Sequence, residues 1–128
     1  MLIVDDNRNF ADALVSALRS HGVDAKAAYS GSEGIASALE SHPDWIVMDV
    51  IMGEIDGVDA AIAICETAPV PRVLLTSGHE DAHRRLAKGS ARGHDFELVV
   101  KPIQLAWLLQ RLRSLDSKQH FHGTARAA

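Results

Sequence analysis

Residues 45–49 read Trp-Ile-Val-Met-Asp, a run of four apolar residues that ends in an aspartate. The run does not alternate between apolar and polar side chains, as a strand with one face in water would. It is typical of a central parallel strand that is covered on both faces. This segment therefore predicts a parallel sheet enclosed between helices.

Similar short strands recur along the chain, and each is followed by a segment with helical periodicity. In the first such segment Phe10, Leu14 and Leu18 recur at intervals of four residues. The second strand is more polar, which suits the edge of a sheet. Five β-α units with right-handed crossovers predict an α/β fold, a doubly wound five-stranded parallel sheet. The strands are expected at residues 2–4, 23–29, 45–48, 73–75 and 98–100.

Composition limits the classes of protein that this chain can represent. Its 128 residues are 47% hydrophobic and carry a formal net charge of −4, which indicates one globular domain and disfavours a general nucleic-acid binder. The single cysteine, Cys65, cannot form an internal disulfide. No apolar run reaches the roughly 18 residues of a membrane span, and the amino terminus does not resemble a secretory signal. We therefore expect a cytoplasmic protein without membrane insertion.

The chain divides into a domain at residues 1–116 and a tail at residues 117–128. The tail is polar, rich in small residues and without apolar periodicity, so we expect it to be disordered. The expected fourth helix, around residues 82–92, has few apolar side chains, so it is expected to be the least firmly docked element. Its basic residues are Arg84, Arg85, Lys88 and Arg92.

Polar residues stand where four of the expected strands end. Asp5 and Asp6 follow the first strand, Asp49 ends the third, Thr76 follows the fourth and Lys101 follows the fifth. The carboxyl ends of parallel strands lie at the same edge of a sheet. The fold is therefore expected to bring these residues together, although they are almost a hundred positions apart in the sequence.

A cluster of three carboxylates requires a cation, because their mutual repulsion would otherwise keep one of them protonated. Carboxylates, a backbone carbonyl and water are the oxygen ligands that Mg²⁺ prefers, and Mg²⁺ usually shares its site with a phosphate. A carboxylate can attack phosphorus when positive charge, here from Mg²⁺ and Lys101, offsets the repulsion. The Thr76 hydroxyl could then donate a hydrogen bond to a phosphoryl oxygen and move the loop that follows it.

The ordered set of motifs resembles the receiver domains of bacterial response regulators, which are CheY-like proteins of two-component signalling. The resemblance extends from Met1 to about Leu115. The matching segments are Leu-Ile-Val-Asp-Asp at 2–6, Pro-Asp-Trp-Ile-Val-Met-Asp at 43–49, Met-Gly-Glu-Ile-Asp-Gly at 52–57, Val-Leu-Leu-Thr-Ser at 73–77 and Val-Lys-Pro at 100–102.

This resemblance implies a flavodoxin-like fold with strand order 2-1-3-4-5 and a role for each site residue. Asp49 would be the phosphoacceptor, Thr76 the switch hydroxyl and Lys101 the partner of the phosphoryl group. The expected Mg²⁺ ligands are Asp5, Asp6, Asp49 and the backbone carbonyl of Ile51.

The resemblance also implies the partners. A sensor histidine kinase or a histidine phosphotransfer protein would donate the phosphoryl group, and the signal would pass by protein contacts to a downstream target or an adjoining domain, without direct nucleic-acid binding. The chain would not be an ordinary enzyme but a phosphoacceptor that assists its own phosphorylation and dephosphorylation. A homodimer through the face formed by the fourth helix, fifth strand and fifth helix is a further expectation.

Several residues depart from the family pattern. Gly53 stands where most receivers have proline, Leu98 replaces the usual switch aromatic, and Ser77 and Gly78 replace the commoner small apolar residue and its neighbour. These departures leave open an alternative, a receiver-like interaction scaffold that works without phosphorylation.

One short motif points to a different class of protein. Residues 79–83 read His-Glu-Asp-Ala-His and match the zinc-peptidase pattern through His79, Glu80 and His83. The match stands at the start of a polar helix and no convincing third ligand follows, so a zinc hydrolase is only a remote alternative.

Overall fold

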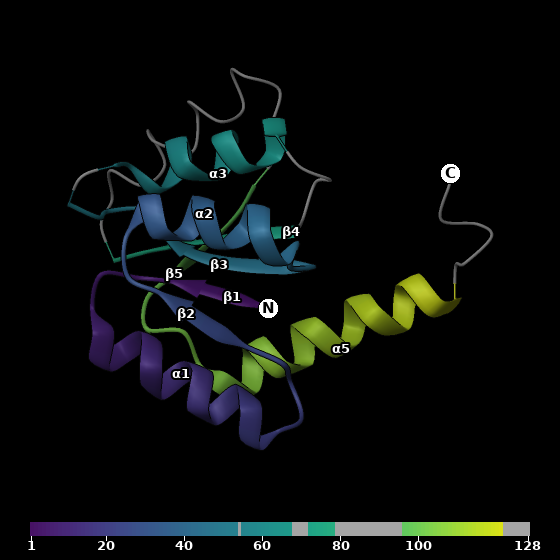
Figure 1. Ribbon diagram of the computed structural model, residues 1–128. Helices are drawn as coiled ribbons and strands as arrows, with labels where there is room; N and C mark the ends of the chain where they lie inside the picture. Colours follow the sequence, from purple (N-terminus) through teal and green to yellow (C-terminus); the bar gives the residue numbers. More distant parts are fainter. Residues whose placement is uncertain (54, 68–71, 79–95, 122–128) are drawn as a thin grey trace.

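The computed structural model describes residues 1–53, 55–67, 72–78 and 96–121, with side chains as far as Ser114. Strands and helices alternate in these ranges as the sequence predicts (Figure 1). The predicted fourth helix lies outside the described residues. The described elements are β1 (Leu2–Val4), α1 (Arg8–Ser20), β2 (Lys26–Ala28), α2 (Gly31–Ser41), β3 (Trp45–Asp49), α3 (Gly57–Thr67), β4 (Arg72–Ser77), β5 (Glu97–Val100) and α5 (Leu105–Phe121).

The five strands form one parallel sheet in the order β2-β1-β3-β4-β5. This is a flavodoxin-like α/β fold, so the predicted fold class and strand order are confirmed. The polar strand β2 lies at an edge of the sheet, also as predicted. The chain reverses its direction of winding between β1 and β3, and ligand sites of such sheets lie at that point, beyond the carboxyl ends of the strands.

The described helices cover both faces of the sheet. α2 and α3 lie on one face, and α1 and α5 lie on the other (Figure 1). Two apolar cores result, which we name the α2–α3 core and the α1–α5 core. The strand β3 shows why both exist, because Ile46 and Met48 enter the α2–α3 core while Trp45 and Val47 enter the α1–α5 core. All five residues of β3 are buried, which confirms the prediction of a central strand.

Two local expectations were wrong. The second strand is shorter than residues 23–29, because it pairs only with β1 and only three residues of each strand form the ladder. The sequence pattern also places Leu39 on the apolar face of the second helix, together with Ile35 and Ala38, but 39% of the surface of Leu39 is exposed. The buried face of α2 is formed by Gly31, Gly34 and Ala38, which recur at helical spacing, and Leu39 lies about 100° around the helix from Ala38.

Helix α5 continues to Phe121, so the expected domain boundary at residue 116 falls inside the helix. Residues 122–128 of the expected tail lie outside the described residues, whereas residues 117–121 are part of this helix. The physical reason is that no glycine or proline follows Pro102 before Gly123, so nothing in the sequence ends the helix earlier. No helix in the described part of the chain combines the length and apolar character needed to cross a bilayer.

Candidate functional site

The polar residues at the strand ends meet at one edge of the sheet. Asp5 follows β1, Asp49 is the last residue of β3, and Thr76 of β4 is the register partner of Asp49. Lys101 follows β5 and is held there by its backbone N–H, which donates to the Ser77 carbonyl at 3.0 Å. Asp5, Asp49 and Thr76 are 2%, 6% and 1% exposed. The structure thus brings together the residues that the sequence placed at the strand ends.

The start of α1 fixes the direction of the first carboxylate. Asn7 is the N-cap of α1, and its side chain accepts a hydrogen bond from the Phe10 N–H at 3.1 Å. The Asn7 N–H in turn donates to Asp5 Oδ1 at 2.9 Å. Because Asn7 satisfies the end of the helix, neither Asp5 nor Asp6 serves as the cap of α1.

Three carboxylates form a group that fits a hard cation. Asp5, Asp6 and Asp49 each offer an oxygen, and these oxygens all lie within 4.8 Å of one another. Asp5 and Asp49 are buried whereas Asp6 is exposed, so the group opens to solvent on one side. An all-oxygen donor set with room for water is the kind of site that suits Mg²⁺.

Lys101 supplies the positive charge of the site. Its Nζ donates to Asp5 Oδ2 and to Asp49 Oδ2, each at 3.2 Å, and its side chain is 31% exposed. Burial lowers the pKa of Lys101, but attraction to Asp49 and Asp5 outweighs burial and raises the pKa above its ordinary value. The ammonium group therefore stays charged between the two buried carboxylates.

Asp49 is poorly stabilised as an anion in the metal-free protein. Burial raises its pKa, and repulsion from Asp5 raises the pKa further. Lys101 and the Ile51 N–H, which donates to Asp49 Oδ1 at 3.3 Å, oppose this rise only in part. The cluster is thus short of positive charge, as expected for a site that binds a cation.

The raised pKa of Asp49 predicts that Asp49→Asn stabilises the metal-free protein. A carboxyl group whose pKa is higher in the folded state binds its proton more tightly there, so its ionisation at neutral pH opposes folding. We expect a melting temperature that is a few degrees higher in EDTA at neutral pH. The gain should shrink as the pH falls through the raised pKa and vanish below the ordinary value of 3.8.

The control for this measurement is Asp44→Asn, which changes the net charge equally at an exposed position just before β3. Scanning calorimetry of both variants across acid and neutral pH is the test. An equal gain in both variants would contradict the conclusion that the ionised Asp49 carboxylate opposes folding. A gain in Asp49→Asn that persists at the lowest pH would contradict it as well.

Gly57 allows the chain to pass close behind Asp49. Its N–H donates to the Val50 carbonyl at 2.8 Å. A Cβ at this position would lie 2.0 Å from the Asp49 carbonyl oxygen and 2.8 Å from the Val50 Cα. Only glycine fits here without a movement of the backbone that carries Asp49.

Gly57→Ala is therefore expected to lower the free energy of unfolding by about 1–3 kcal/mol, the usual cost of overpacking. The matched control is Gly53→Ala, because no atom of the described residues lies within 4 Å of a Cβ at Gly53. Urea unfolding of both variants provides the comparison. If Gly57→Ala proves as stable as Gly53→Ala, the backbone at Gly57 does not lie as close to the Asp49 carbonyl oxygen as described.

The other residues that the sequence analysis singled out lie outside this cluster of polar side chains or outside the described residues. Ile51 follows Asp49 by two positions and is exposed. Leu98 lies in β5 and packs, partly buried, against the α2–α3 core. His79, Glu80 and His83 lie outside the described residues, as do the basic residues of the expected fourth helix. The sequence analysis gave no role to Asn7 or to Gly57. Asn7 carries the signal of a capping residue before a helix, whereas Gly57 entered only as the last residue of the matching segment at 52–57.

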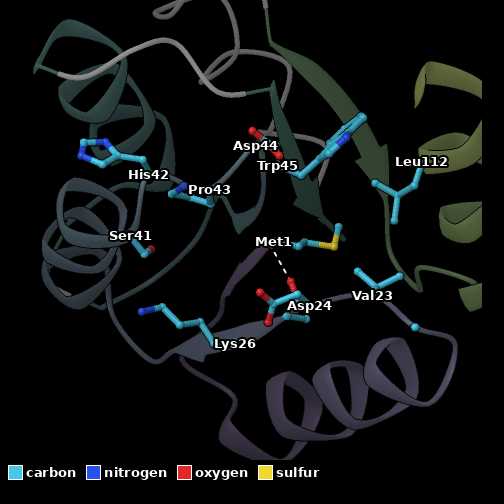
Figure 2. Close-up of a pocket in the computed structure, with 12 residues that line it drawn as sticks. Met1, Val23, Asp24, Lys26, Ser41, His42, Pro43, Asp44, Trp45 and Leu112 are labelled. Atoms are coloured by element: carbon cyan, nitrogen blue, oxygen red, sulfur yellow. Dashed lines mark hydrogen bonds between the residues drawn. The ribbon is translucent and has the colours of Figure 1, made fainter. Parts of the chain in front are cut away.

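A cavity of about 610 Å³ lies at the opposite, amino-terminal edge of the sheet (Figure 2). Its wall includes Met1, Asp24, Lys26, His42 and Trp45. The Met1 amino group donates to the Asp24 carbonyl at 2.8 Å across it. None of the residues at the carboxyl ends of the strands lines this cavity, so it is separate from the acidic site.

The fold and the acidic edge define the class of protein, a flavodoxin-like α/β domain with carboxylates at its topological switch point. The family model described as "Response regulator receiver domain" matches residues 1–113. The chain belongs to this family and is a receiver domain of the response regulators of two-component systems.

Curated relatives agree with the family assignment. The chain is 33% identical over 115 residues to the transcriptional regulatory protein PrrA of Mycobacterium tuberculosis, covering 90% of this chain and 48% of that protein. It is also 33% identical over 115 residues to the transcriptional regulatory protein AfsQ1 of Streptomyces coelicolor, covering 90% of this chain and 50% of that protein. The chain thus spans about half the length of the curated relatives that it matches.

Solved structures agree as well. The chemotaxis protein CheY4 of Vibrio cholerae superposes with a TM-score of 0.75 at 25% identity, covering 88% of this chain and 94% of that chain. A CheY-like receiver domain protein of Methanospirillum hungatei superposes with a TM-score of 0.80 at 18% identity, covering 93% of this chain and 94% of that chain. The second likeness concerns the fold alone.

Proposed function

We propose that this receiver domain is a phosphoacceptor, in which Asp49 accepts a phosphoryl group with the help of Mg²⁺. The observation that carries the proposal is the arrangement at one sheet edge, where Lys101 Nζ lies 3.2 Å from Oδ2 of both Asp5 and Asp49. One carboxylate oxygen from each of Asp5, Asp6 and Asp49 lies within 4.8 Å of the other two. This combines a carboxylate nucleophile, a cation site and a fixed positive charge.

In the proposed reaction an Asp49 carboxylate oxygen forms a bond to the phosphorus of a phosphohistidine. The phosphorus–nitrogen bond breaks, and its electron pair stays on the imidazole nitrogen of the donor. Asp49 is left as an aspartyl phosphate. A histidine kinase or a histidine phosphotransfer protein is the proposed donor, in keeping with the family.

Asp5, Asp6, Asp49 and the carbonyl of Ile51 are the proposed ligands of Mg²⁺. When bound, the ion neutralises charge on the phosphoryl oxygens, which is the chemistry that metal ions supply in phosphoryl transfer. Lys101 would contribute a second positive charge through its contact with Asp49 Oδ2 at 3.2 Å. Because Asp49 is itself the group that is modified, and the protein would assist only its own phosphorylation and dephosphorylation, we do not regard it as an ordinary enzyme.

Thr76 is the proposed sensor of the new group. It lies beside Asp49 in the register of β3 and β4, and its backbone carbonyl accepts from the Val50 N–H at 2.9 Å. A hydrogen bond from its hydroxyl to a phosphoryl oxygen would shift the end of β4. Because the curated relatives are transcriptional regulators of about twice this length, we propose that the shift alters contacts with an adjoining domain or a separate protein.

Intact-protein mass spectrometry after incubation with acetyl phosphate and Mg²⁺ tests this function. We expect the gain of one phosphoryl group, no gain in EDTA and no gain in Asp49→Ala. Equal uptake by Asp49→Ala would show that Asp49 is not the acceptor. A lack of uptake by the wild type, together with no structural response to beryllofluoride and Mg²⁺, would favour a scaffold that works without phosphorylation.

A further inference from the structure

An aromatic ring from α1 lies next to the charged group of the site. The Phe10 ring has the Lys101 ammonium over it, with Nζ 5.5 Å from the ring centroid. Phe10 is half-buried and also packs against the α1–α5 core. A cation within about 6 Å of the face of an aromatic ring is attracted by the ring quadrupole. The ring therefore contacts the very group that we propose to assist phosphoryl transfer.

The position of this ring is tied to the same carboxylate that Lys101 contacts. The Asn7 N–H donates to Asp5 Oδ1 at 2.9 Å, and the Phe10 N–H donates to the Asn7 side chain at 3.1 Å. From the other side, Lys101 Nζ donates to Asp5 Oδ2 at 3.2 Å. Asp5, Asn7, Phe10 and Lys101 thus form a closed circuit of contacts. The backbone of Phe10 and the ammonium of Lys101 are therefore both anchored to Asp5, which keeps the ring and the ammonium close to each other.

The charges around Lys101 indicate that the Phe10 ring does more than pack against the core. Lys101 is 31% exposed, and a lysine side chain that is not held can extend into water. Its two carboxylate partners are also the proposed ligands of Mg²⁺, so a bound cation would weaken their hold on the ammonium. The attraction between the Lys101 ammonium and the Phe10 ring would persist with the cation bound, because the ring is neutral and is not a metal ligand.

We propose that Phe10 is a positioning residue, whose ring face holds the Lys101 ammonium beside Asp49 during phosphoryl transfer. The proposal rests on the function proposed above for Asp49 and Lys101. Packing against the α1–α5 core needs only an apolar side chain, so leucine would satisfy it. Phe10→Leu removes the ring face, whereas Phe10→Tyr keeps it.

A double-mutant cycle with acetyl phosphate and Mg²⁺ tests the proposal. Phe10→Leu is expected to slow phosphorylation of Asp49 by about two- to fivefold, the range expected for a partly exposed cation–π contact. Phe10→Tyr should recover most of that rate. In a Lys101→Met background, Phe10→Leu should cause no further loss. An equal loss in both backgrounds, or a Phe10→Tyr variant as slow as Phe10→Leu, would overturn the proposal.

A second measurement separates this proposal from the proposed function. In the unphosphorylated protein the ring current of Phe10 should move the NMR signals of the Lys101 ε-methylene protons upfield, and Lys101→Met identifies these signals. The upfield shift should be lost in Phe10→Leu and kept in Phe10→Tyr. If the shift is absent from the wild type, the Phe10 ring does not lie against Lys101 and this proposal fails, even when phosphorylation succeeds. If the shift is present but no phosphoryl group is taken up, the proposed function fails instead.

Discussion

Lys101→Met is expected to slow the phosphorylation of Asp49 by about 100-fold, the usual effect of removing one well-placed donor from a site of developing negative charge. The wild-type ammonium lies 3.2 Å from Asp49 Oδ2 and stays charged. Without it, the Asp49 carboxylate and an incoming phosphoryl group repel each other with only Mg²⁺ to offset the charge. Time courses of intact mass with acetyl phosphate and Mg²⁺ measure the rate.

Two further variants make this result interpretable. Lys26→Met removes an equal charge from the exposed surface of β2 and should leave the rate unchanged. Lys101→Arg keeps the charge but not the compact ammonium, and it should fall between Lys101→Met and the wild type. Circular dichroism establishes that each variant is folded. A Lys101→Met protein that is folded and phosphorylated at the wild-type rate would exclude Lys101 from the reaction.

Mg²⁺ is expected to stabilise the wild type strongly, and Asp6→Asn is expected to abolish most of this effect. At about 100 times its dissociation constant, a ligand that binds only the folded state adds about 2.7 kcal/mol to the free energy of unfolding. Asp6 is exposed and belongs to the acidic group without contacting Lys101, so its replacement removes a proposed ligand and leaves the buried ion pairs intact. Urea unfolding with and without Mg²⁺ measures the difference.

Asp24→Asn is the matched control for this experiment. It removes one exposed carboxylate at the amino-terminal edge of the sheet, beside the cavity and away from the acidic group. The control should keep the full stabilisation by Mg²⁺. If Mg²⁺ stabilises Asp6→Asn as much as it stabilises Asp24→Asn, Asp6 is not a ligand.

The sequence predicted the parts of the fold that depend on buried strands. Residues 45–49 are apolar without alternation because β3 has helices on both of its faces. The meeting of Asp5, Asp49, Thr76 and Lys101 followed from topology alone, since all four stand at the carboxyl ends of parallel strands. These features need only the order of elements and no detail of side-chain packing.

Features that depend on side-chain packing could not be predicted from the pattern of apolar and polar residues. Leu39 fits a helical apolar pattern, but α2 packs through its small residues, and Gly34 lies against Val4. The need for glycine at position 57 arises from a contact with the Asp49 carbonyl oxygen, which no local pattern reveals. The proximity of Phe10 to Lys101 joins residues far apart in the sequence through the start of α1 and the end of β5.

The most direct test of the central claim is to locate the phosphoryl group in the chain. Borohydride reduces an acyl phosphate to an alcohol, so a phosphorylated aspartate becomes homoserine and remains marked through proteolysis. After treatment with acetyl phosphate and Mg²⁺, tandem mass spectrometry should find homoserine at position 49 and aspartate at positions 5 and 6. Homoserine at position 5 or 6 with aspartate intact at 49, or no homoserine in a sample that carries the phosphoryl mass, would contradict the assignment of Asp49 as the phosphoacceptor.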